Sequence, residues 1–445
     1  MKYIYGLQKS GISLANYLYS IGEDFYAWDD NKNVRNLFLL KFNDIKLKKP
    51  KELNLSIIKE AYITPGISFN NTNLSLLNKY KISLFRDLDY YLSIVKKEKI
   101  LAITGTNGKS TTTKLISDLI KQNKDDCFVG GNIGVPLLDF KLLNDKSNFH
   151  VIELSSFQLE SIKKIDSYIS ILLNLSHDHL DRYRSFEDYI KTKKKILNMN
   201  KNSFNIISVD DNFCKKIYKE LKNKNKIAIS LNRIKKGIYF LDNCIHDNFF
   251  YENKIIHLED LSESLQGKIN IQNILATYAV SEILKFNITN FHQTLKFFKG
   301  LPHRLEIILN NKKLIVVNNS KATNIDSTLN SINDYENIYL ILGGKLKQDN
   351  FTSILDFKHK IKTCYLIGES SNIIFNQIKF SVDSKICNTL EIAIENIILD
   401  LSQTKNDIKS TILFSPACSS FDQFLNFEER GNAFKTLIAK NFHKK

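Results

Sequence analysis

The sequence predicts an α/β protein of three domains, because short apolar strands alternate with amphipathic helical segments along most of its 445 residues. At about 150 residues per domain, this length accommodates about three separate cores. Charged residues interrupt the apolar periodicity near 87–99, where we expect a linker, and Leu301-Pro-His-Arg-Leu-Glu306 marks a second boundary. We therefore predict domains at 1–90, 91–299 and 300–445.

The first domain has the pattern of a Rossmann-like unit. A strand at 3–5 runs into a turn between Gly6 and Gly11, a helix follows, and a second strand ends in Asp29 and Asp30. In Rossmann folds an acidic residue about twenty positions after the glycine turn contacts a ribose. The middle glycine of the usual motif is missing here, so an ordinary βαβ unit without a ligand remains the alternative.

The central domain contains a glycine loop, Thr104-Gly-Thr-Asn-Gly-Lys-Ser-Thr111, between the apolar run 100–103 and the amphipathic run 114–122. Strand, glycine loop and a helix beginning near Lys109, in this order, bind phosphates, because backbone N–H groups and the helix N-terminus face the same space. Lys109 would contact the outer phosphates, and Ser110 or Thr111 would offer a hydroxyl to Mg²⁺. Ile103 replaces the first glycine of the full P-loop pattern, so this is a shortened variant. The alternative is a strand-to-helix turn with an exposed lysine.

Further polar residues follow the next strands of this domain. Glu153 lies in the buried strand 150–158, and strand 168–175 runs into a segment with His177 and His179. We expect these strands to form a P-loop ATPase-like parallel sheet. Parallel strands end at one edge of a sheet, so Glu153 and His179 should meet the Mg²⁺-nucleotide there. The alternative places both histidines in a surface loop. The glycine-rich segment 129–136 brings Asn132 close to the same region.

The overall composition excludes few functions. The net charge of +16 would suit nucleic acid, a membrane surface or an anionic substrate, but the lysines are spread evenly along the chain. No apolar segment reaches about 18 residues and no signal peptide is apparent, so we expect a soluble cytoplasmic protein without membrane insertion. The cysteines lack C-x-x-C spacing and predict neither a zinc site nor a disulfide framework; they are Cys127, Cys214, Cys244, Cys364, Cys387 and Cys418.

The last domain resumes the βα alternation. Apolar strands are expected at 314–317, 338–342, 363–368 and 411–414, which predicts a second Rossmann-like domain. Just before it, Asn270 and Asn273 lie one turn apart on one face of a helix.

Several segments together closely resemble the Mur ligases over essentially the whole chain. They are Thr104–Thr111, Gly130-Gly-Asn-Ile-Gly134, Glu153-Leu-Ser-Ser-Phe-Gln158, Asp178-His-Leu-Asp-Arg-Tyr183, Leu301-Pro-His-Arg304, Ser320-Lys-Ala-Thr-Asn324 and Ser415-Pro-Ala-Cys-Ser-Ser-Phe-Asp-Gln-Phe424. The segments at 178–183 and 415–418 are similar to those of the D-glutamate-adding members. The resemblance implies an ATP-dependent ligase of peptidoglycan precursor synthesis, with ADP and phosphate as products. It would add D-glutamate to UDP-N-acetylmuramoyl-L-alanine through an acyl phosphate, with Mg²⁺ present.

The resemblance also implies a role for individual residues. Lys109, His179 and Lys193 would be catalytic, and Lys193 matches a position where the family carries a lysine carbamylated by CO₂. The metal ligands would be Ser110, Glu153, His179 and the modified Lys193. The nucleotide contacts would be Gly105, Thr106, Asn107, Gly108, Lys109, Ser110, Thr111, Asn270, Asn273, Arg304 and Asn319. The substrate contacts would be Lys9, Ser10, Asp29, Asn132, Ser155, Phe157, Lys321, Thr323, Lys347, Ser420 and Phe427.

Two positions depart from the family pattern, and other functions remain open. Asn319 stands where the family usually has Asp, and Ile269 where it has His. An amide accepts hydrogen bonds less strongly than a carboxylate, which puts a ribose contact of Asn319 in question. The rival functions are a related ligase acting on another amino acid or on folate, and a basic P-loop protein that binds nucleic acid. We expect a monomer that does not bind nucleic acid, and Lys193 could instead be an exposed lysine of a basic helix. We expect Lys191, Lys194 and Lys195 to be solvated, because they point elsewhere around that helix.

Overall fold

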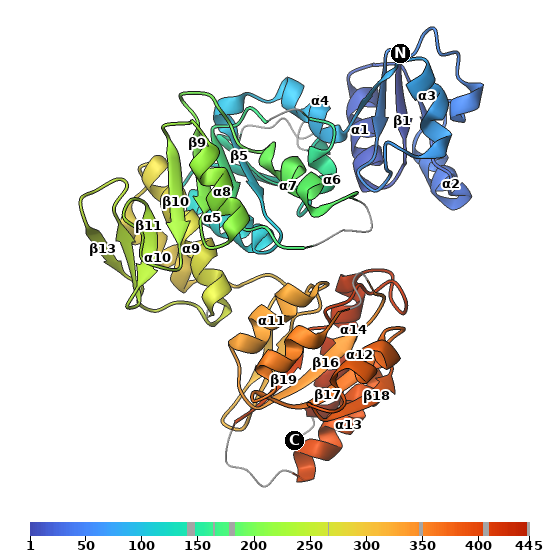
Figure 1. Ribbon diagram of the computed structural model, residues 1–445. Helices are drawn as coiled ribbons and strands as arrows, with labels where there is room; N and C mark the ends of the chain where they lie inside the picture. Colours follow the sequence, from blue (N-terminus) through green and yellow to red (C-terminus); the bar gives the residue numbers. More distant parts are fainter. Residues whose placement is uncertain are drawn as a thin grey trace. The chain divides into compact units, whose positions relative to one another are not determined.

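The computed structural model describes residues 1–139, 147–162, 165–177, 183–265, 267–346, 350–403 and 409–442, without the side chains of Lys268 and Ile269. Three predominantly parallel sheets of four, nine and six strands organise this part of the chain (Figure 1). It forms two compact units. The first contains Met1–Leu175, Phe186–His257 and Gln272–Thr294, and the second contains Ser176–Ser185, Leu258–Ile271 and the chain from Leu295 onward. The predicted α/β class is confirmed.

The four-stranded sheet is parallel, in the order β2-β1-β3-β4. In its inner strand β1, Tyr3, Ile4 and Tyr5 are fully buried, as expected where helices cover both faces of a parallel sheet. The strands are β1 (Lys2–Tyr5), β2 (Phe25–Trp28), β3 (Glu60–Ile63) and β4 (Ser83–Phe85); the helices are α1 (Lys9–Ser20), α2 (Lys32–Lys41), α3 (Ser75–Lys79) and α4 (Asp87–Ile94), with 3₁₀ turns at Pro50–Glu52 and Thr72–Leu74.

The segment predicted as a linker, 87–99, begins with helix α4 and continues into a 3₁₀ turn at Lys97–Lys99. The charges that interrupt the apolar periodicity are helix-start signals: Asp87 and Asp89 lie in the first turn, where the helix dipole favours acidic groups. The Asp89 carboxylate also accepts a hydrogen bond from the backbone N–H of Arg86, at 2.7 Å. The domain boundaries at 90/91 and 299/300 stay predictions.

The nine-stranded sheet has the order β13-β12-β11-β10-β9-β8-β5-β7-β6, and only the pairs β11–β12 and β12–β13 are antiparallel. Its strands are β5 (Ile100–Thr104), β6 (Cys127–Gly131), β7 (Phe149–Glu153), β8 (Ile169–Leu172), β9 (Phe204–Ser208), β10 (Lys226–Ser230), β11 (Ile238–Leu241), β12 (Cys244–Asp247) and β13 (Lys254–His257). Its helices are α5 (Lys109–Gln122), α6 (Ser156–Leu159), α7 (Phe186–Lys194), α8 (Asn212–Glu220), α9 (Lys268–Ile283) and α10 (Ile288–Lys296), with a 3₁₀ turn at Glu263–Leu265. Because β5, β6 and β7 run parallel, their carboxyl ends share one edge.

The six-stranded sheet has the order β14-β15-β19-β16-β17-β18, and only β14 is antiparallel. Helices α11 and α12 cover one apolar core and helices α13 and α14 cover another, so this sheet is doubly wound. The strands are β14 (Glu306–Asn310), β15 (Leu314–Asn318), β16 (Ile338–Gly343), β17 (Ile361–Ile367), β18 (Ser384–Asn388) and β19 (Ser410–Phe414); the helices are α11 (Ile325–Asn333), α12 (Ser371–Ile378), α13 (Leu390–Gln403) and α14 (Phe427–Phe442), with a 3₁₀ turn at Thr352–Phe357.

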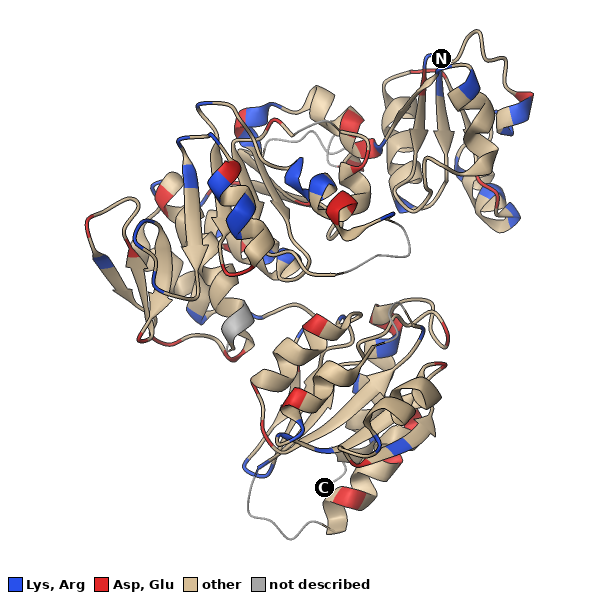
Figure 2. Ribbon diagram, in the orientation of Figure 1, with Lys and Arg blue, Asp and Glu red and all other residues tan. Residues whose placement is uncertain are grey.

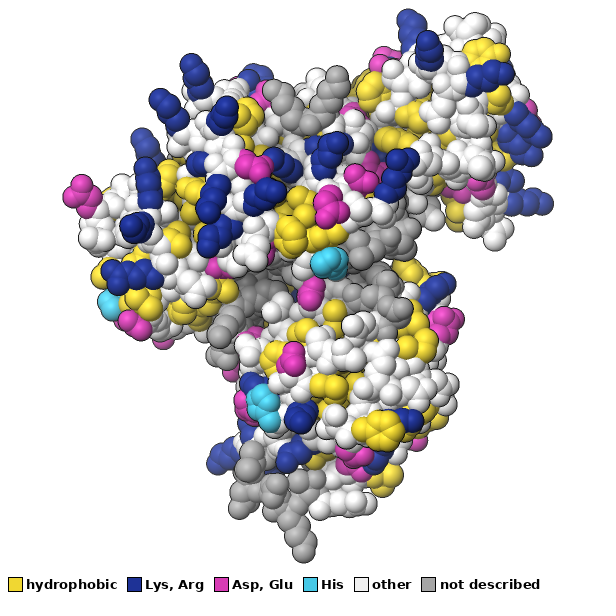
Figure 3. Space-filling view, viewed as in Figure 1, with side chains coloured by type: hydrophobic (Ala, Val, Ile, Leu, Met, Phe, Trp, Pro, Cys, Tyr) yellow, Lys and Arg dark blue, Asp and Glu magenta, His cyan; other side chains and the backbone are white. Residues whose placement is uncertain are grey.

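Charged residues of both signs occur around all three sheets (Figure 2). On the face shown in Figure 3, Lys and Arg side chains are spread widely, with acidic side chains between them. Within the part of the chain that the structure describes, no helix is both long and apolar enough to cross a membrane.

Helix α14 lies so close to the segment before β14 that a side chain at Gly431 would not fit. A Cβ atom there would lie 2.2 Å from Nδ1 of His303. We therefore expect Gly431→Ala to lower the free energy of unfolding by about 1–3 kcal/mol, the usual cost of overpacking a core. Urea unfolding followed by circular dichroism measures this change. Asn432→Ala, at the exposed neighbouring position, is the control, and equal stability of the two variants would contradict the packing argument.

Candidate active site

The glycine loop between β5 and α5 has the geometry of a phosphate-binding turn. Gly108 adopts φ 82° directly before the helix, and a Cβ atom there would lie 2.4 Å from Oδ1 of Asn273. Lys109 begins α5, as predicted, and its Nζ donates to the carbonyl oxygens of Gly105 (3.0 Å) and Thr106 (2.7 Å). The ammonium group and the N-terminus of a 14-residue helix therefore adjoin the same loop.

Asn174, which follows β8, holds this loop through both its backbone and its side chain. Its carbonyl oxygen accepts from the N–H of Thr106 (2.9 Å), and its Oδ1 accepts from the N–H of Asn107 (2.7 Å). Its Nδ2 donates to Asn107 O and to Oε1 of Gln272 on α9. The hydroxyl groups of Thr106 and Tyr189 lie 3.0 Å apart. The loop is thus fixed by the neighbouring strand end and by two helices before any ligand binds.

Glu153, the last residue of β7, brings a fully buried carboxylate to the same sheet edge. One of its oxygens accepts from the hydroxyl of Ser110, and the other accepts from Nδ2 of Asn132 at 2.7 Å. Carboxylate and hydroxyl oxygens are the ligands that Mg²⁺ prefers. Among the described residues, no three His, Cys, Asp or Glu side chains form a metal-binding group, and His179 lies outside them. Glu153 and Ser110 therefore fit part of a Mg²⁺ site.

Lys193 reaches the glycine loop from helix α7. Its side chain is buried, and Nζ donates to Gly105 O (2.8 Å) and Oγ1 of Thr104 (3.2 Å). Nζ also lies 5.0 Å from the ring centre of Tyr189. Because this side chain is buried, the interpretation of Lys193 as an exposed lysine of a basic helix is wrong. Such burial is rare for lysine.

The other lysines of this segment differ from one another. Lys191 is exposed and Lys194 forms an ion pair with Glu220 at 2.9 Å. We expected Lys195 to be solvated too, but its Nζ donates to the carbonyl oxygens of Leu159 and Glu160. Burial lowers the pKa of Lys195 below its usual value.

The two asparagines of α9 that were predicted to contact the nucleotide make different contacts. Oδ1 of Asn273 accepts from the hydroxyl of Thr112 on α5 (3.0 Å), which ties α9 to the helix of the glycine loop. Nδ2 of Asn270 donates to Ser264 O at 3.2 Å. Both lie on α9, one turn apart, but they belong to different compact units.

The predicted sugar-nucleotide contacts of the first sheet surround its glycine turn. Oδ2 of Asp29 accepts from the N–H of Leu7 at 2.8 Å, so this carboxylate closes the turn rather than pointing away from it. Ser10 forms a hydrogen bond with the buried Asp87, whose pKa is raised chiefly by burial. Lys9 begins α1 and is exposed. In the central domain, Ser155 caps α6, which carries Phe157.

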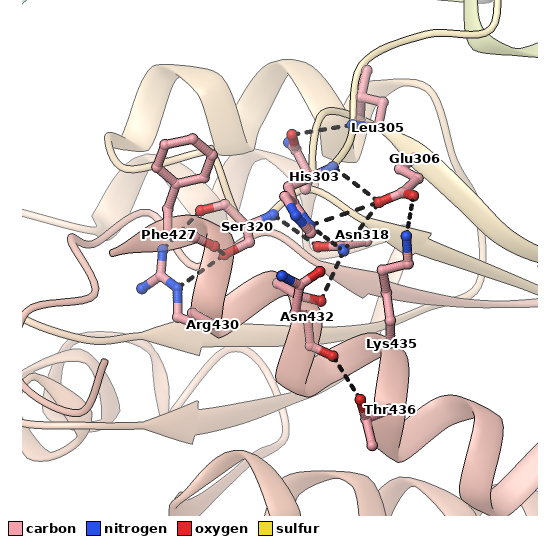
Figure 4. A network of polar contacts seen from close by, with 12 residues as sticks. His303, Leu305, Glu306, Asn318, Ser320, Phe427, Arg430, Asn432, Lys435 and Thr436 are labelled. Carbon is pink, nitrogen blue, oxygen red and sulfur yellow. Dashed lines mark hydrogen bonds and ion pairs between the residues drawn. The ribbon is translucent and has the colours of Figure 1, made fainter. Parts of the chain in front are cut away.

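In the second unit a polar network joins the start of β14 to β15 and α14 (Figure 4). Nδ2 of Asn318 donates to Nδ1 of His303 (2.9 Å) and to Gly431 O (3.1 Å). Glu306 accepts from the backbone N–H of His303 (2.9 Å) and from Nζ of Lys435 (2.6 Å). This network fixes the segment that contains Arg304.

Lys321 and Phe427, two predicted substrate contacts, lie together: Nζ of Lys321 is 4.0 Å from the ring centre of Phe427. Ser420 is buried and Thr323 is partly buried. The amide of Asn319 is used inside the protein, where Oδ1 accepts from Leu305 N (3.3 Å) and Nδ2 donates to Oγ of Ser415 (3.2 Å). Lys347 and the side chain of Ile269 lie outside the described residues.

A comparison with known proteins decides the family. Residues 103–281 match the model of the Mur ligase middle domain. The chain is 36% identical to a UDP-N-acetylmuramoylalanine–D-glutamate ligase of Rickettsia prowazekii (strain Madrid E), over 99% of this chain and 98% of the relative. It is 31% identical to a ligase of the same name from Koribacter versatilis (strain Ellin345), over 98% of this chain and 96% of the relative. The chain belongs to the Mur ligase family.

Solved structures support the same fold. A UDP-N-acetylmuramate-alanine ligase, MurC, from Thermotoga maritima matches with a TM-score of 0.61 at 16% identity, covering 99% of both chains. A MurF from Acinetobacter baumannii matches with a TM-score of 0.62 at 13% identity, covering 100% of this chain and 93% of that one. The three sheets thus form a Mur ligase fold.

Several residues that hold candidate contacts in the two units of this Mur ligase were not singled out from the sequence. Asn174 lies at the end of a predicted strand, so a search for polar residues at the ends of apolar strands would have found it. Tyr189 precedes Lys193 by one helical turn, which places both on one face. Arg430 is fully buried in α14. The sequence of this amphipathic helix does not indicate that the arginine is buried rather than exposed.

The buried imidazole of His303 predicts a pH effect on stability. Burial lowers the pKa of His303 below its usual value of about 6.5, although the Glu306 carboxylate acts to raise it. As the pH falls through about 6.5, the unfolded chain gains a proton that the folded chain does not, so the free energy of unfolding decreases. His303→Asn removes the titration, and asparagine tolerates the φ of 62° at this position.

We therefore expect the variant to lose less stability than the unmodified chain between pH 7 and pH 5. Urea unfolding across this range measures the difference between the two proteins. Parallel pH dependences would contradict the assignment of a depressed pKa to His303.

Proposed function

We propose that this chain joins D-glutamate to UDP-N-acetylmuramoyl-L-alanine with ATP, a step of peptidoglycan precursor synthesis. The observation that carries this proposal is the full-length similarity to ligases named for that reaction, in a chain whose glycine loop has phosphate-binding geometry. The reaction forms an amide. The alanine carboxylate attacks the γ-phosphorus, ADP leaves, the D-glutamate amine attacks the acyl phosphate, and phosphate and a proton are released.

The proposed site addresses the main obstacle to this chemistry, the repulsion between a carboxylate and a triphosphate. Lys109 and the N-terminus of α5 would place positive charge at the phosphates. Ser110 and Glu153 would hold Mg²⁺, which screens phosphate charge when bound. Asn132 donates to Glu153 and thereby orients the carboxylate. The adenine would lie near Asn273.

The remaining proposed contacts are distributed over the three sheets. We propose that Lys9, Ser10 and Asp29 contact the UDP end, that Ser155 and Phe157 contact the muramoyl side, and that the second unit contributes the amino-acid end. The substrate contacts proposed there are Lys321, Thr323, Lys347, Ser420 and Phe427. Arg304 and Asn319, in the same unit, are proposed to contact the nucleotide. We further propose domains at 1–90, 91–299 and 300–445 and a cytoplasmic monomer that needs neither nucleic acid nor a membrane.

Phosphate release should require both proposed substrates, because the acyl phosphate needs a carboxylate to form and an amine to react onward. We expect steady release of phosphate from ATP only when UDP-N-acetylmuramoyl-L-alanine and D-glutamate are both present. A coupled assay for ADP and mass spectrometry of the amide product measure the reaction. Equal turnover with L-lysine or meso-diaminopimelate in place of D-glutamate would assign the chain to another branch of the family.

Lys193 should be essential because we propose that its amine becomes a carbamate. The neutral Nζ would form an N–C bond with CO₂ and release a proton to solvent, which converts a cation into a carboxylate-like anion. Such a group suits a position beside Mg²⁺ ligands, and the side chain is already buried against the glycine loop. We expect Lys193→Ala to lower activity by roughly 10–100-fold or more, the scale for groups that support a metal site.

A small added carboxylate such as acetate or formate should partly restore this variant, because it can occupy the vacated anionic position. Lys194→Ala, which removes the neighbouring lysine that pairs with Glu220 on the protein surface, is the matched control and should retain its activity without rescue. Normal turnover of Lys193→Ala, or equal stimulation of both variants by the carboxylate, would contradict the proposed modification.

A further inference from the structure

The two largest side chains that are fully buried in the described part of the chain are both arginines, Arg86 and Arg430. Burying a guanidinium group is costly unless its donors are satisfied. Arginine offers five N–H donors in a rigid planar fork, so it can join several segments at once, whereas lysine offers three donors at one point. The contacts of each arginine show which segments it joins.

Arg86 stands between β4 and α4 and holds the loop after β3. Its Nη1 lies within hydrogen-bonding distance of the carbonyl oxygens of Ile63 (3.0 Å), Thr64 (2.6 Å) and Ile67 (2.8 Å). Its Nη2 forms an ion pair with Glu160 at 2.7 Å, at the end of α6. One guanidinium group therefore connects the first sheet to the helix that carries Phe157.

The loop that Arg86 holds packs directly on the glycine turn of the first sheet. A Cβ atom on Gly6 would lie 2.0 Å from Oγ1 of Thr64, and one on Gly11 would lie 3.1 Å from its Cγ2. Displacing Thr64 would therefore displace the turn that presents Lys9 and Ser10. The residue after Arg86, Asp87, adds a hydrogen bond to Ser10. The proposed UDP contacts thus depend on the position of this loop.

Arg430 joins the segments after β15 and β19 in the second unit. Its Nη2 donates to Ser320 O (2.8 Å) and Cys418 O (3.1 Å), and its Nη1 donates to Ser419 O (3.1 Å). Its Nε donates to Oγ of Ser320 (3.1 Å), and this hydroxyl donates to Phe427 O at 2.9 Å. Figure 4 shows Arg430, Ser320 and Phe427 in this arrangement.

The segments that Arg430 joins lead directly to proposed amino-acid contacts: Lys321 follows Ser320, Ser420 follows Ser419, and Phe427 lies one turn before Arg430 on α14. Burial lowers the pKa of Arg430 to about 10, so the group stays charged at neutral pH.

We propose that the two buried arginines are positioning residues for opposite ends of the substrate pair, Arg86 for the UDP-sugar and Arg430 for the amino acid. The link to these two ligands rests on the proposed function. The positioning itself does not, because it follows from the contacts of each guanidinium group. Lysine at either position keeps the charge but cannot bridge the same set of oxygens.

The test compares Arg86→Lys with Arg430→Lys in the full-length chain. We expect Arg86→Lys to raise the KM for UDP-N-acetylmuramoyl-L-alanine by about tenfold or more while the KM for D-glutamate changes less than about twofold. Arg430→Lys should give the reverse pattern. Lys226→Met is the matched control, because Nζ of Lys226 also joins two carbonyl oxygens, those of Tyr218 and Leu221, away from both sets of proposed contacts. It should leave both KM values within about twofold.

Hydrogen exchange measured by mass spectrometry gives a readout that needs no substrate. Exchange should accelerate at 63–69 in Arg86→Lys and at 418–424 in Arg430→Lys, with little change at the other segment. If both variants speed exchange over the whole chain, or raise both KM values equally, the arginines only stabilise the fold and the proposal fails. If the local exchange pattern appears but the unmodified chain does not use D-glutamate, the positioning stands and the proposed function fails.

Discussion

The turn from β5 into α5 is the constraint on which the first unit depends. A polypeptide can leave a buried parallel strand and enter a helix within four residues only if the backbone adopts conformations that side chains disfavour. Gly108 meets this condition because its φ is 82° and Asn273 leaves no room for a Cβ atom. The tight turn places the first N–H groups of α5 at the sheet edge where β6 and β7 also end. Asn132 and Glu153 meet at this edge, and the long side chain of Lys193 reaches the glycine loop from α7.

Hydrogen bonds to neighbouring polar groups explain how a carboxylate and a lysine can both be buried at this edge of an apolar sheet. Glu153 accepts hydrogen bonds from Ser110 and Asn132, while Nζ of Lys193 donates to Thr104 and Gly105. Each group uses partners from a different element, so the correct arrangement forms only when strands and helices have packed. Such preorganisation avoids reorienting these dipoles during the reaction.

The sequence predicted the architecture well because its signals are local. Apolar strands, glycine turns and helix periodicity identify elements by themselves, and Lys109 indeed begins α5. One prediction failed for a reason that local patterns do not contain. Lys195 was expected in solvent, but its partners are carbonyl groups at 159 and 160, about 35 positions earlier in the chain.

The same reasoning explains why Arg86 and Arg430 escaped detection although the residues around them were predicted. A sequence pattern identifies a group that would contact a ligand, because its chemistry matches the ligand. It does not identify a group whose partners are backbone carbonyl oxygens, since every residue type offers the same carbonyl. Arg86 lies about 20 positions from the loop it holds, and Arg430 lies 110 positions from Ser320. Such residues become visible only through burial and contact geometry, and they determine where the residues predicted from the sequence are held.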